Sequence, residues 1–147
     1  MSTFLSLRVL TLKSMAAVVL ASCAATAGAD PAGINAQWNP TLADKLKIPK
    51  YCWAQFDENF RKQTGIKMPT ELCGVTMNHF CPGLIMLNRA QDSKASPNER
   101  HDYMREAIGG FNYTARSMPP NCPLKPDLDA AKIKADFVAR MLPRGTR

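Results

Sequence analysis

The chain has 147 residues and a formal net charge of +7, and 46% of its residues are hydrophobic. Once the export signal described below is removed, residues 30–147 can build one domain with a modest core and are too few for two. The basic residues are scattered, which is typical of a solvated surface, and no nucleic-acid-recognition motif occurs, so we expect no nucleic acid partner.

Residues 1–29 have the pattern of a secretory signal peptide. Arg8 and Lys13 precede a short apolar run, and Ala27-Gly28-Ala29 forms a small-residue cleavage site. The run is too short to cross a bilayer, which needs about 20 apolar residues. We therefore expect the folded part of the chain to lie outside the cytoplasm, in the periplasm or secreted.

A second interpretation of the same segment concerns Cys23. The tetrapeptide Leu20-Ala21-Ser22-Cys23 is similar to a bacterial lipobox, which is cut before a cysteine that becomes lipid-modified. Several acyl chains would hold the protein on the outer membrane, because each buried methylene contributes about 0.8 kcal/mol. The alternative is cleavage after Ala29 without lipidation. The mature protein would then have no lipid anchor, and we expect no membrane contact in that case.

Removal of the signal leaves four cysteines, an even number in an oxidising compartment. We expect two disulfides, each contributing about 2–4 kcal/mol to a small core. Four cysteines allow three pairings, and their spacing does not select one. The four residues are Cys52, Cys73, Cys81 and Cys122.

The first half of the folded region contains weak helix signals. Residues 30–40 form a flexible leader, and residues 41–47 are predicted to form a short helix capped by Thr41 with Asp44 at its third position. Residues 51–62 are predicted to form one continuous helix, which ends before breaks at Gly65 and Pro69. Three aromatic residues share a face of that helix: Trp53, Phe56 and Phe60.

The strongest core candidate begins near Cys81 and runs to about Asp92. Pro82 fits the first turn of this helix, where a missing N–H is tolerated. Its apolar residues recur at helical spacing and are Met77, Phe80, Cys81, Leu84, Leu87 and Ala90.

The next helix has a clear start, because Ser96-Pro97-Asn98-Glu99 is a capping box with proline at the first helical position. Gly109 and Gly110 each destabilise a helix by about 1 kcal/mol relative to alanine, so we expect a neighbouring helix to approach closely there. Pro119 and Pro120 end the helix. Its expected buried stripe is Met104, Ala107, Ile108, Phe111, Ala115 and Met118.

A last helix is predicted over residues 126–142, with a proline and an acid in its first turn. Its expected buried residues are Leu128, Ala131, Ala135, Val138 and Leu142. Residues 143–147 form a tail. Because no segment alternates like a strand, we predict an all-α single domain over residues 41–142, a small helical bundle stapled by disulfides.

Residues 78–120 resemble a tetratricopeptide-type helical hairpin. Gly83 matches the small residue of the first helix, Ala107 the crossing position, Phe111 the packing aromatic and Pro119 the terminal proline. Thr114 departs from the family, which usually has a small apolar residue there. The resemblance implies an antiparallel hairpin with the flanking helices 51–62 and 126–142 packed against it, since a single unit cannot bury its own face.

The resemblance also limits the cysteine pairing. If the hairpin forms, Cys122 at the end of the second helix lies near the start of the first helix. The resemblance then implies that Cys122 pairs with Cys73 or Cys81 and that Cys52 takes the other, so a Cys52–Cys122 link is not expected.

The densest group of possible metal ligands is Met77, His79 and Cys81, whose soft donors suit copper. The competing interpretation, which we favour, places Met77 and Cys81 in the core, Cys81 in a disulfide and His79 at a helix start. No Cys-x-x-Cys-His, nucleophile-elbow or phosphate-loop motif occurs, so no catalytic residue is assigned, and no cofactor is expected unless copper binds.

An exposed aromatic groove is the candidate binding surface. Tyr51 and Trp53 could contribute, but the residues chosen for partner contact are Tyr103, Tyr113, Arg89, Arg105 and Arg116. The first functional hypothesis is an exported, non-enzymatic binding or assembly module of the bacterial envelope that docks a protein or an extracellular polymer. The alternative is a periplasmic copper-binding protein.

Overall fold

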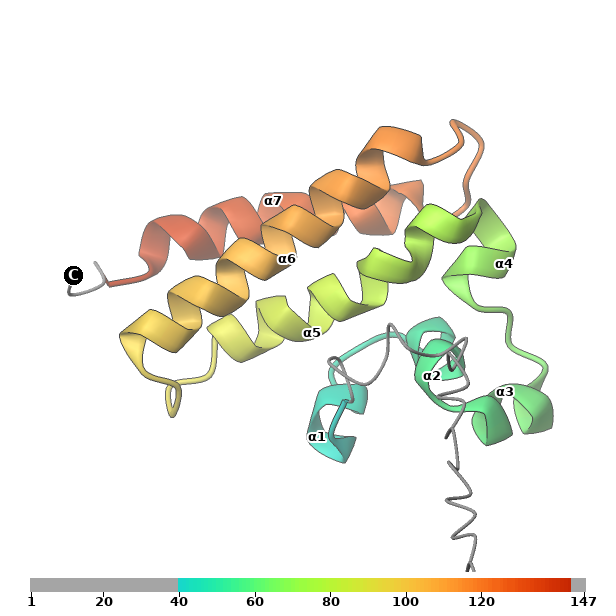
Figure 1. Cartoon of the computed structure of the whole chain (residues 1–147), viewed down its shortest axis with the longest axis horizontal. Coiled ribbons are helices and arrows are strands. Elements are labelled where there is room, and N and C mark those ends of the chain that lie inside the picture. The colour runs from blue at the N-terminus through green and yellow to red at the C-terminus, as the bar shows by residue number, and fades with distance from the viewer. Residues whose placement is uncertain (1–39, 144–147) are drawn as a thin grey trace, which may run out of the picture. The chain divides into compact units, whose positions relative to one another are not determined.

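The computed structural model describes residues 40–143, so the signal, Cys23, the leader up to residue 39 and residues 144–147 lie outside the described part. Residues 40–143 are all-helical and contain no β-strand, which confirms the predicted class (Figure 1). The elements are α1 (Leu42–Lys45), α2 (Lys50–Phe56), α3 (Glu58–Thr64), α4 (Pro69–Cys73), a 3-10 helix η1 (Val75–His79), α5 (Phe80–Ala90), α6 (Pro97–Ser117) and α7 (Lys125–Met141).

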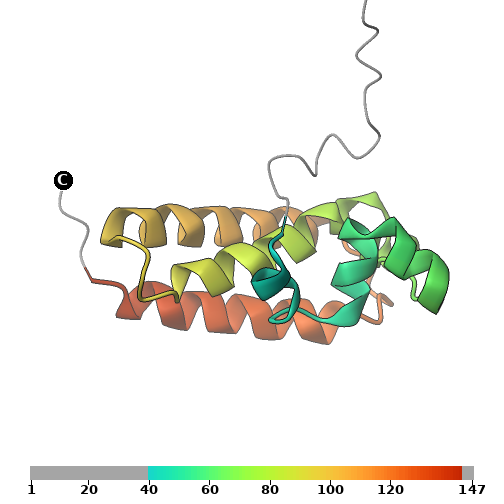
Figure 2. The ribbon, with the colours of Figure 1, turned by 90° about the horizontal axis from the view of Figure 1, so that it is seen from below.

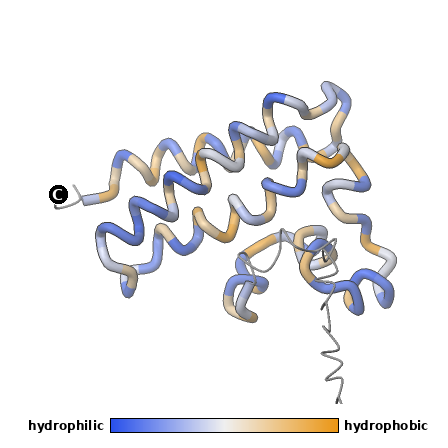
Figure 3. Tube along the Cα trace, viewed as in Figure 1, coloured by the Kyte–Doolittle hydropathy of each residue, from blue (hydrophilic) through white to orange (hydrophobic). Residues whose placement is uncertain are grey.

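The three longest helices run side by side and form the body of the fold (Figures 1 and 2). The α5 and α6 helices form an antiparallel hairpin with the most extensive interface in the described residues, and α7 returns along α6. Hydrophobic and hydrophilic segments alternate along α6 and α7, as expected for helices that bury one face (Figure 3). The predicted bundle and hairpin architecture is therefore present.

The α5–α6 hairpin crosses closely at two glycines. A Cβ on Gly83 would lie 2.7 Å from Cε1 of Phe111, whose ring occupies the space where a side chain at 83 would stand. A Cβ on Gly110 would lie 3.0 Å from the carbonyl oxygen of His79. The predicted close approach is thus confirmed at Gly110, whereas a Cβ on Gly109 would have no neighbour within 4 Å.

The buried stripe of α6 differs from the prediction at its C-terminal end. Ala115 is exposed, and Thr114 is fully buried instead. The hydroxyl of Thr114 donates a hydrogen bond to the carbonyl oxygen of Thr76 at 3.2 Å. Because this bond satisfies its polar group, a threonine can occupy a core position for which an apolar residue was expected.

The predicted continuous helix 51–62 is wrong, because the chain breaks at Asp57. This residue has an extended backbone (φ −139°, ψ 97°) and caps α3 by accepting a hydrogen bond from the Phe60 N–H at 3.0 Å. Lys45 Nζ lies 3.0 Å from the same carboxylate. The break turns the chain so that Trp53 packs on Phe60 with ring centroids 5.4 Å apart.

Two short elements follow that the sequence patterns did not predict. Pro69, predicted to break the chain, is the first residue of α4, and the Met68 N–H donates to the Glu71 carboxylate at 2.6 Å to cap it. The η1 turn then leads into α5, which begins at Phe80 and ends at Ala90, within two residues of the predicted bounds.

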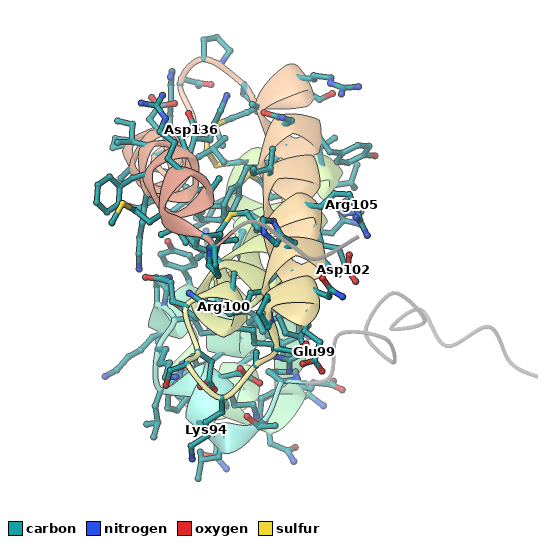
Figure 4. The ribbon with its side chains drawn as sticks, turned by 90° about the vertical axis from the view of Figure 1, so that its left-hand side faces the viewer. Lys94, Glu99, Arg100, Asp102, Arg105 and Asp136 are labelled. Carbon is teal, nitrogen blue, oxygen red and sulfur yellow. A yellow bond between two sulfur atoms is a disulfide. The ribbon has the colours of Figure 1, made fainter. Side chains whose placement is uncertain are left out.

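The predicted helix caps are confirmed. Thr41 and Asp44 form a capping box on α1, and Ser96 and Glu99 form one on α6. In Figure 4, Lys94 marks the loop between α5 and α6, and Glu99 and Arg100 mark the first turn of α6. The Arg100 guanidinium donates to the Ala90 carbonyl oxygen at 2.8 Å and so closes the loop. The five predicted buried residues of the last helix are all buried: Leu128, Ala131, Ala135, Val138 and Leu142.

Two disulfides join the short N-terminal helices to this body. Cys52–Cys81 links α2 to α5, and Cys73–Cys122 links α4 to the segment before α7. This pairing is one of the two that the hairpin resemblance allowed. Disulfides are typical of proteins that fold in an oxidising, exported location.

Substitution at the α5–α6 crossing tests the packing. Gly83→Ala should lower the free energy of unfolding by about 1–3 kcal/mol, because its methyl overlaps the buried Phe111 ring. Gly109→Ala is the matched control and should be neutral or stabilising by up to about 1 kcal/mol, because the site is open and helical. Urea unfolding measures both, and equal effects of the two substitutions would contradict the crossing.

The disulfide pairing predicts a defined set of linked peptides. A non-reducing peptide map of the purified protein should contain Cys52–Cys81 and Cys73–Cys122. Replacing both Cys73 and Cys122 with serine should lower the free energy of unfolding by about 2–4 kcal/mol, because the crosslink no longer restricts the unfolded chain. A Cys52–Cys122 peptide in the map would overturn the pairing.

Candidate functional site

The outer face of α7 carries a row of three large apolar residues with no partner in residues 40–143. The side chains of Ile133, Phe137 and Met141 are 72%, 64% and 69% exposed. They follow one another at intervals of four residues, so they form a single ridge along the helix, about 12 Å from end to end. This row is hereafter the α7 ridge.

The α7 ridge is distinct from the row that holds α7 in the fold. Leu128, Ala131, Ala135 and Val138 are buried and face the other helices. Lys134 and Arg140 border the ridge together with Asp136, which is labelled in Figure 4. A second acid, Asp129, lies one turn before Ile133 and is paired with Lys125 at 2.7 Å. Soluble monomers expose single apolar residues freely, but a contiguous row with charged borders is typical of an interaction surface.

A cavity of about 350 Å³ lies between α2, α5 and α7. Its apolar lining comes from the rings of Tyr51 and Phe80, which stack with centroids 6.3 Å apart, and from leucines and alanines. We call it the Tyr51 cavity. Its lining residues are Lys47, Pro49, Tyr51, Phe80, Leu84, Leu87, Asn88, Asp127, Ala130, Ala131 and Lys134.

A hydrogen bond joins two of the residues that line the Tyr51 cavity. The Tyr51 hydroxyl donates to the Asp127 carboxylate at 2.8 Å and so joins α2 to the first turn of α7. Burial, together with this acceptor, raises the pKa of Tyr51 well above its ordinary value, so the phenol remains a neutral donor. Asn88 donates to the carbonyl oxygen of Lys47 at 3.2 Å, which holds the segment before α2 against α5.

A second cavity of about 430 Å³ lies at the glycine crossing of α5 and α6. It contains the ring pair of His79 and Tyr113, whose centroids are 4.4 Å apart, and the carboxylate of Glu106. Tyr113 is 46% exposed. This surface includes one of the residues chosen from the sequence for partner contact.

The five residues predicted to form one binding groove are not gathered in one place. Tyr103 and Arg89 line a polar cavity near α1, while Tyr113 lies at the glycine crossing. Arg105 pairs with Asp102 on the side of α6 that faces away from α7 (Figure 4). Arg116 is exposed near the end of α6.

Arg89 is a structural residue in this arrangement. Its guanidinium donates to both carboxylate oxygens of Asp44, at 3.3 and 2.7 Å, and thereby ties α1 to α5. Burial opposes ionisation of Asp44, but the hydrogen bonds from Arg89 and Thr41 outweigh it and hold the pKa of Asp44 below its ordinary value. Arg89, predicted as a groove cation, is therefore engaged with Asp44 within the fold.

The predicted copper ligands are not available as a set. Met77 and Cys81 are fully buried, and the Cys81 sulfur is bonded to Cys52. A disulfide sulfur does not supply a thiolate, so the form of the hypothesis that needs a free Cys81 disagrees with this structure. Within residues 40–143, no group of three or more His, Cys, Asp or Glu side chains is placed to hold a metal ion.

The α7 ridge and most of the Tyr51 cavity were missed from the sequence. The four-residue spacing of Ile133, Phe137 and Met141 is visible in the sequence and is a second apolar row on the last helix. A surface helix usually buries one apolar row, so a second, exposed row indicates an interaction surface. The Tyr51–Asp127 contact has no sequence signal, because 76 residues separate its partners.

No protein-family model, curated protein or solved structure matches the chain. The resemblance of residues 78–120 to a tetratricopeptide hairpin therefore stays a prediction. None of the helices in the described residues combines the length and the apolar character needed to cross a membrane.

The Asp44–Arg89 pair predicts a pH-dependent loss of stability. Arg89→Gln should lower the free energy of unfolding at pH 7 by about 1–3 kcal/mol, because it leaves a buried carboxylate without its partner. The pKa of Asp44 is lower in the folded than in the unfolded chain. Its contribution is therefore complete above the unfolded value, about 3.9, and is lost as the pH falls through the folded value.

Urea unfolding at pH 7 and pH 3 checks this prediction, and the effect of Arg89→Gln should shrink at pH 3. Arg105→Gln is the matched control, because its pair with Asp102 is solvent-exposed and should leave stability unchanged at both pH values. An effect of Arg89→Gln that is the same at both pH values would show that the ion pair is not its source.

Proposed function

We propose that this protein is an exported, non-enzymatic binding module of the bacterial envelope and that the α7 ridge docks an amphipathic helix of another exported protein. The observation that carries the proposal is the row of Ile133, Phe137 and Met141, each more than three-fifths exposed. The predicted signal peptide and the two disulfides support an exported location, either periplasmic or secreted, with lipidation of Cys23 as the anchored alternative.

The geometry of the ridge favours a helix as its occupant. Residues at i, i+4 and i+8 form the row that packs into the groove of a second helix. The ridge has one aromatic ring and two aliphatic side chains, whereas a polysaccharide is recognised through polar groups as well as aromatic surfaces. Burying each of these side chains contributes about 1.5–3 kcal/mol, enough for a specific contact once several are combined.

The charged residues that border the ridge indicate which charge its partner carries. Lys134 and Arg140 border the ridge together with Asp136. Asp129, one turn before Ile133, is paired with Lys125 at 2.7 Å, so one excess positive charge remains around the ridge. A helix with an apolar row and acidic borders matches this pattern, and like charges in the border would disfavour basic partners. The rigid attachment of α7 to α6 and α5 reduces the entropy lost on binding.

Site-specific photo-crosslinking in the native host tests the proposal. A benzophenone amino acid at position 137 should yield one adduct with a single, mass-identified exported protein. The same amino acid at position 113, an exposed aromatic site on another face, should not yield it. Ile133→Glu should lower the yield at 137 about tenfold or more, because it places a charge in the apolar contact.

The two crosslinking positions, 113 and 137, and the substituted position 133 are all exposed, so each change can be made without disturbing the core. Circular dichroism should show that Ile133→Glu keeps the helical fold, since its side chain is 72% exposed. An adduct from position 113 alone would move the interface to the α5–α6 face. A homodimer adduct, an adduct with polysaccharide or the absence of any adduct at 137 would each overturn the proposal.

A further inference from the structure

The floor of the Tyr51 cavity is apolar and built from core residues. Phe80 and Leu87 on α5 are at most 1% exposed, and Ala131 on α7 is buried, so the surrounding packing fixes their positions. Leu84 completes the floor and is partly buried. The volume of about 350 Å³ lies in the range of small-molecule sites, which are mostly apolar with a few placed polar groups.

The rim of the Tyr51 cavity carries two basic residues from different segments. Lys47 comes from the connection between α1 and α2, and Lys134 comes from α7. Among the described residues, neither ammonium group forms an ion pair, whereas Lys45, Lys62 and Lys125 do. The two ammonium groups thus remain available above an apolar floor.

The remaining titratable groups of the cavity are Tyr51 and Asp127. The Tyr51 hydroxyl donates to the Asp127 carboxylate at 2.8 Å, so this acid already has a hydrogen-bond donor from the protein. With Tyr51 neutral, the rim carries two positive charges and one negative charge. A ligand with one anionic group and an apolar body complements both the rim and the floor.

We propose that the Tyr51 cavity binds a free medium-chain monocarboxylate, with its alkyl chain on the α5–α7 floor and its carboxylate between Lys47 and Lys134. The α7 ridge residues do not line this cavity, although Lys134 borders both, so the inference goes beyond the proposed docking function and does not depend on it. The protein would then carry a small amphipathic acid and a protein partner at two sites that have Lys134 as a common border residue.

Titration calorimetry of the full disulfide-bonded protein with octanoate tests the inference. Octanoate should bind, and 1-octanol and octyltrimethylammonium should each bind about tenfold more weakly or worse, because they lack the charge-assisted contacts to lysine. In ¹H–¹⁵N spectra, octanoate should shift the amide signals around Tyr51, Leu84 and Ala131.

Substitutions test the two rim lysines and the apolar floor of the cavity separately. Replacing both Lys47 and Lys134 with glutamine should weaken octanoate about tenfold and leave 1-octanol unchanged. Lys132→Gln, on α7 but outside the cavity, is the matched control and should have no effect. Ala130→Phe should block both ligands, because Ala130 is exposed at the rim and a ring there fills the cavity.

A substitution on the α7 ridge separates octanoate binding from protein docking. Phe137→Glu disables the α7 ridge and should leave octanoate binding unchanged. Equal binding of octanoate and 1-octanol, preference for octyltrimethylammonium, shifts confined to other surfaces, or no binding at all would each overturn the carboxylate site.

Discussion

The close crossing of α5 and α6 determines where α7 and the short helices can pack. Gly83 has no side chain, so the Phe111 ring can fill the space beside it, and Gly110 packs against the His79 carbonyl. Two antiparallel helices in such contact leave one broad groove, which the buried row of α7 closes. Once α7 is seated by that row, its second apolar row must face outward, and the α7 ridge is the direct consequence.

The short N-terminal helices depend on covalent and ionic links for their position. Helices of four to seven residues are not stable alone in water. Cys52–Cys81 and Cys73–Cys122 fasten α2 and α4 to the body, and the Asp44–Arg89 pair fastens α1 to α5. The same links position Lys47 and Tyr51 over α5 and so complete the Tyr51 cavity. The links that hold the short helices in place therefore also form one wall of the candidate ligand site.

Local chemistry was predictable from sequence, whereas long-range contacts were not. Ser96 and Glu99 predicted the start of α6 because a capping box acts within four residues. Of the two glycines in α6, Gly110 has the close neighbour that was predicted and Gly109 does not. The aromatic residues on either side of Asp57 have helical spacing, so the sequence predicted one continuous helix. In the structure Asp57 caps α3 and pairs with Lys45, and the chain forms two helices. Burial of Thr114 depends on the carbonyl of Thr76, and the Tyr51–Asp127 bond depends on how three helices meet; neither leaves a periodic signal.

Because α7 buries one apolar row and exposes the other, methyl NMR with a soluble paramagnetic agent should distinguish the two rows. The methyl signals of Ile133 and Met141 should broaden strongly, because their side chains are about 70% exposed. Those of Ile85 and Met86, matched in residue type but at most 3% exposed, should remain sharp. Protection of Ile133 and Met141 to the same degree as Ile85 and Met86 would show that the α7 ridge is covered and is not a free docking surface.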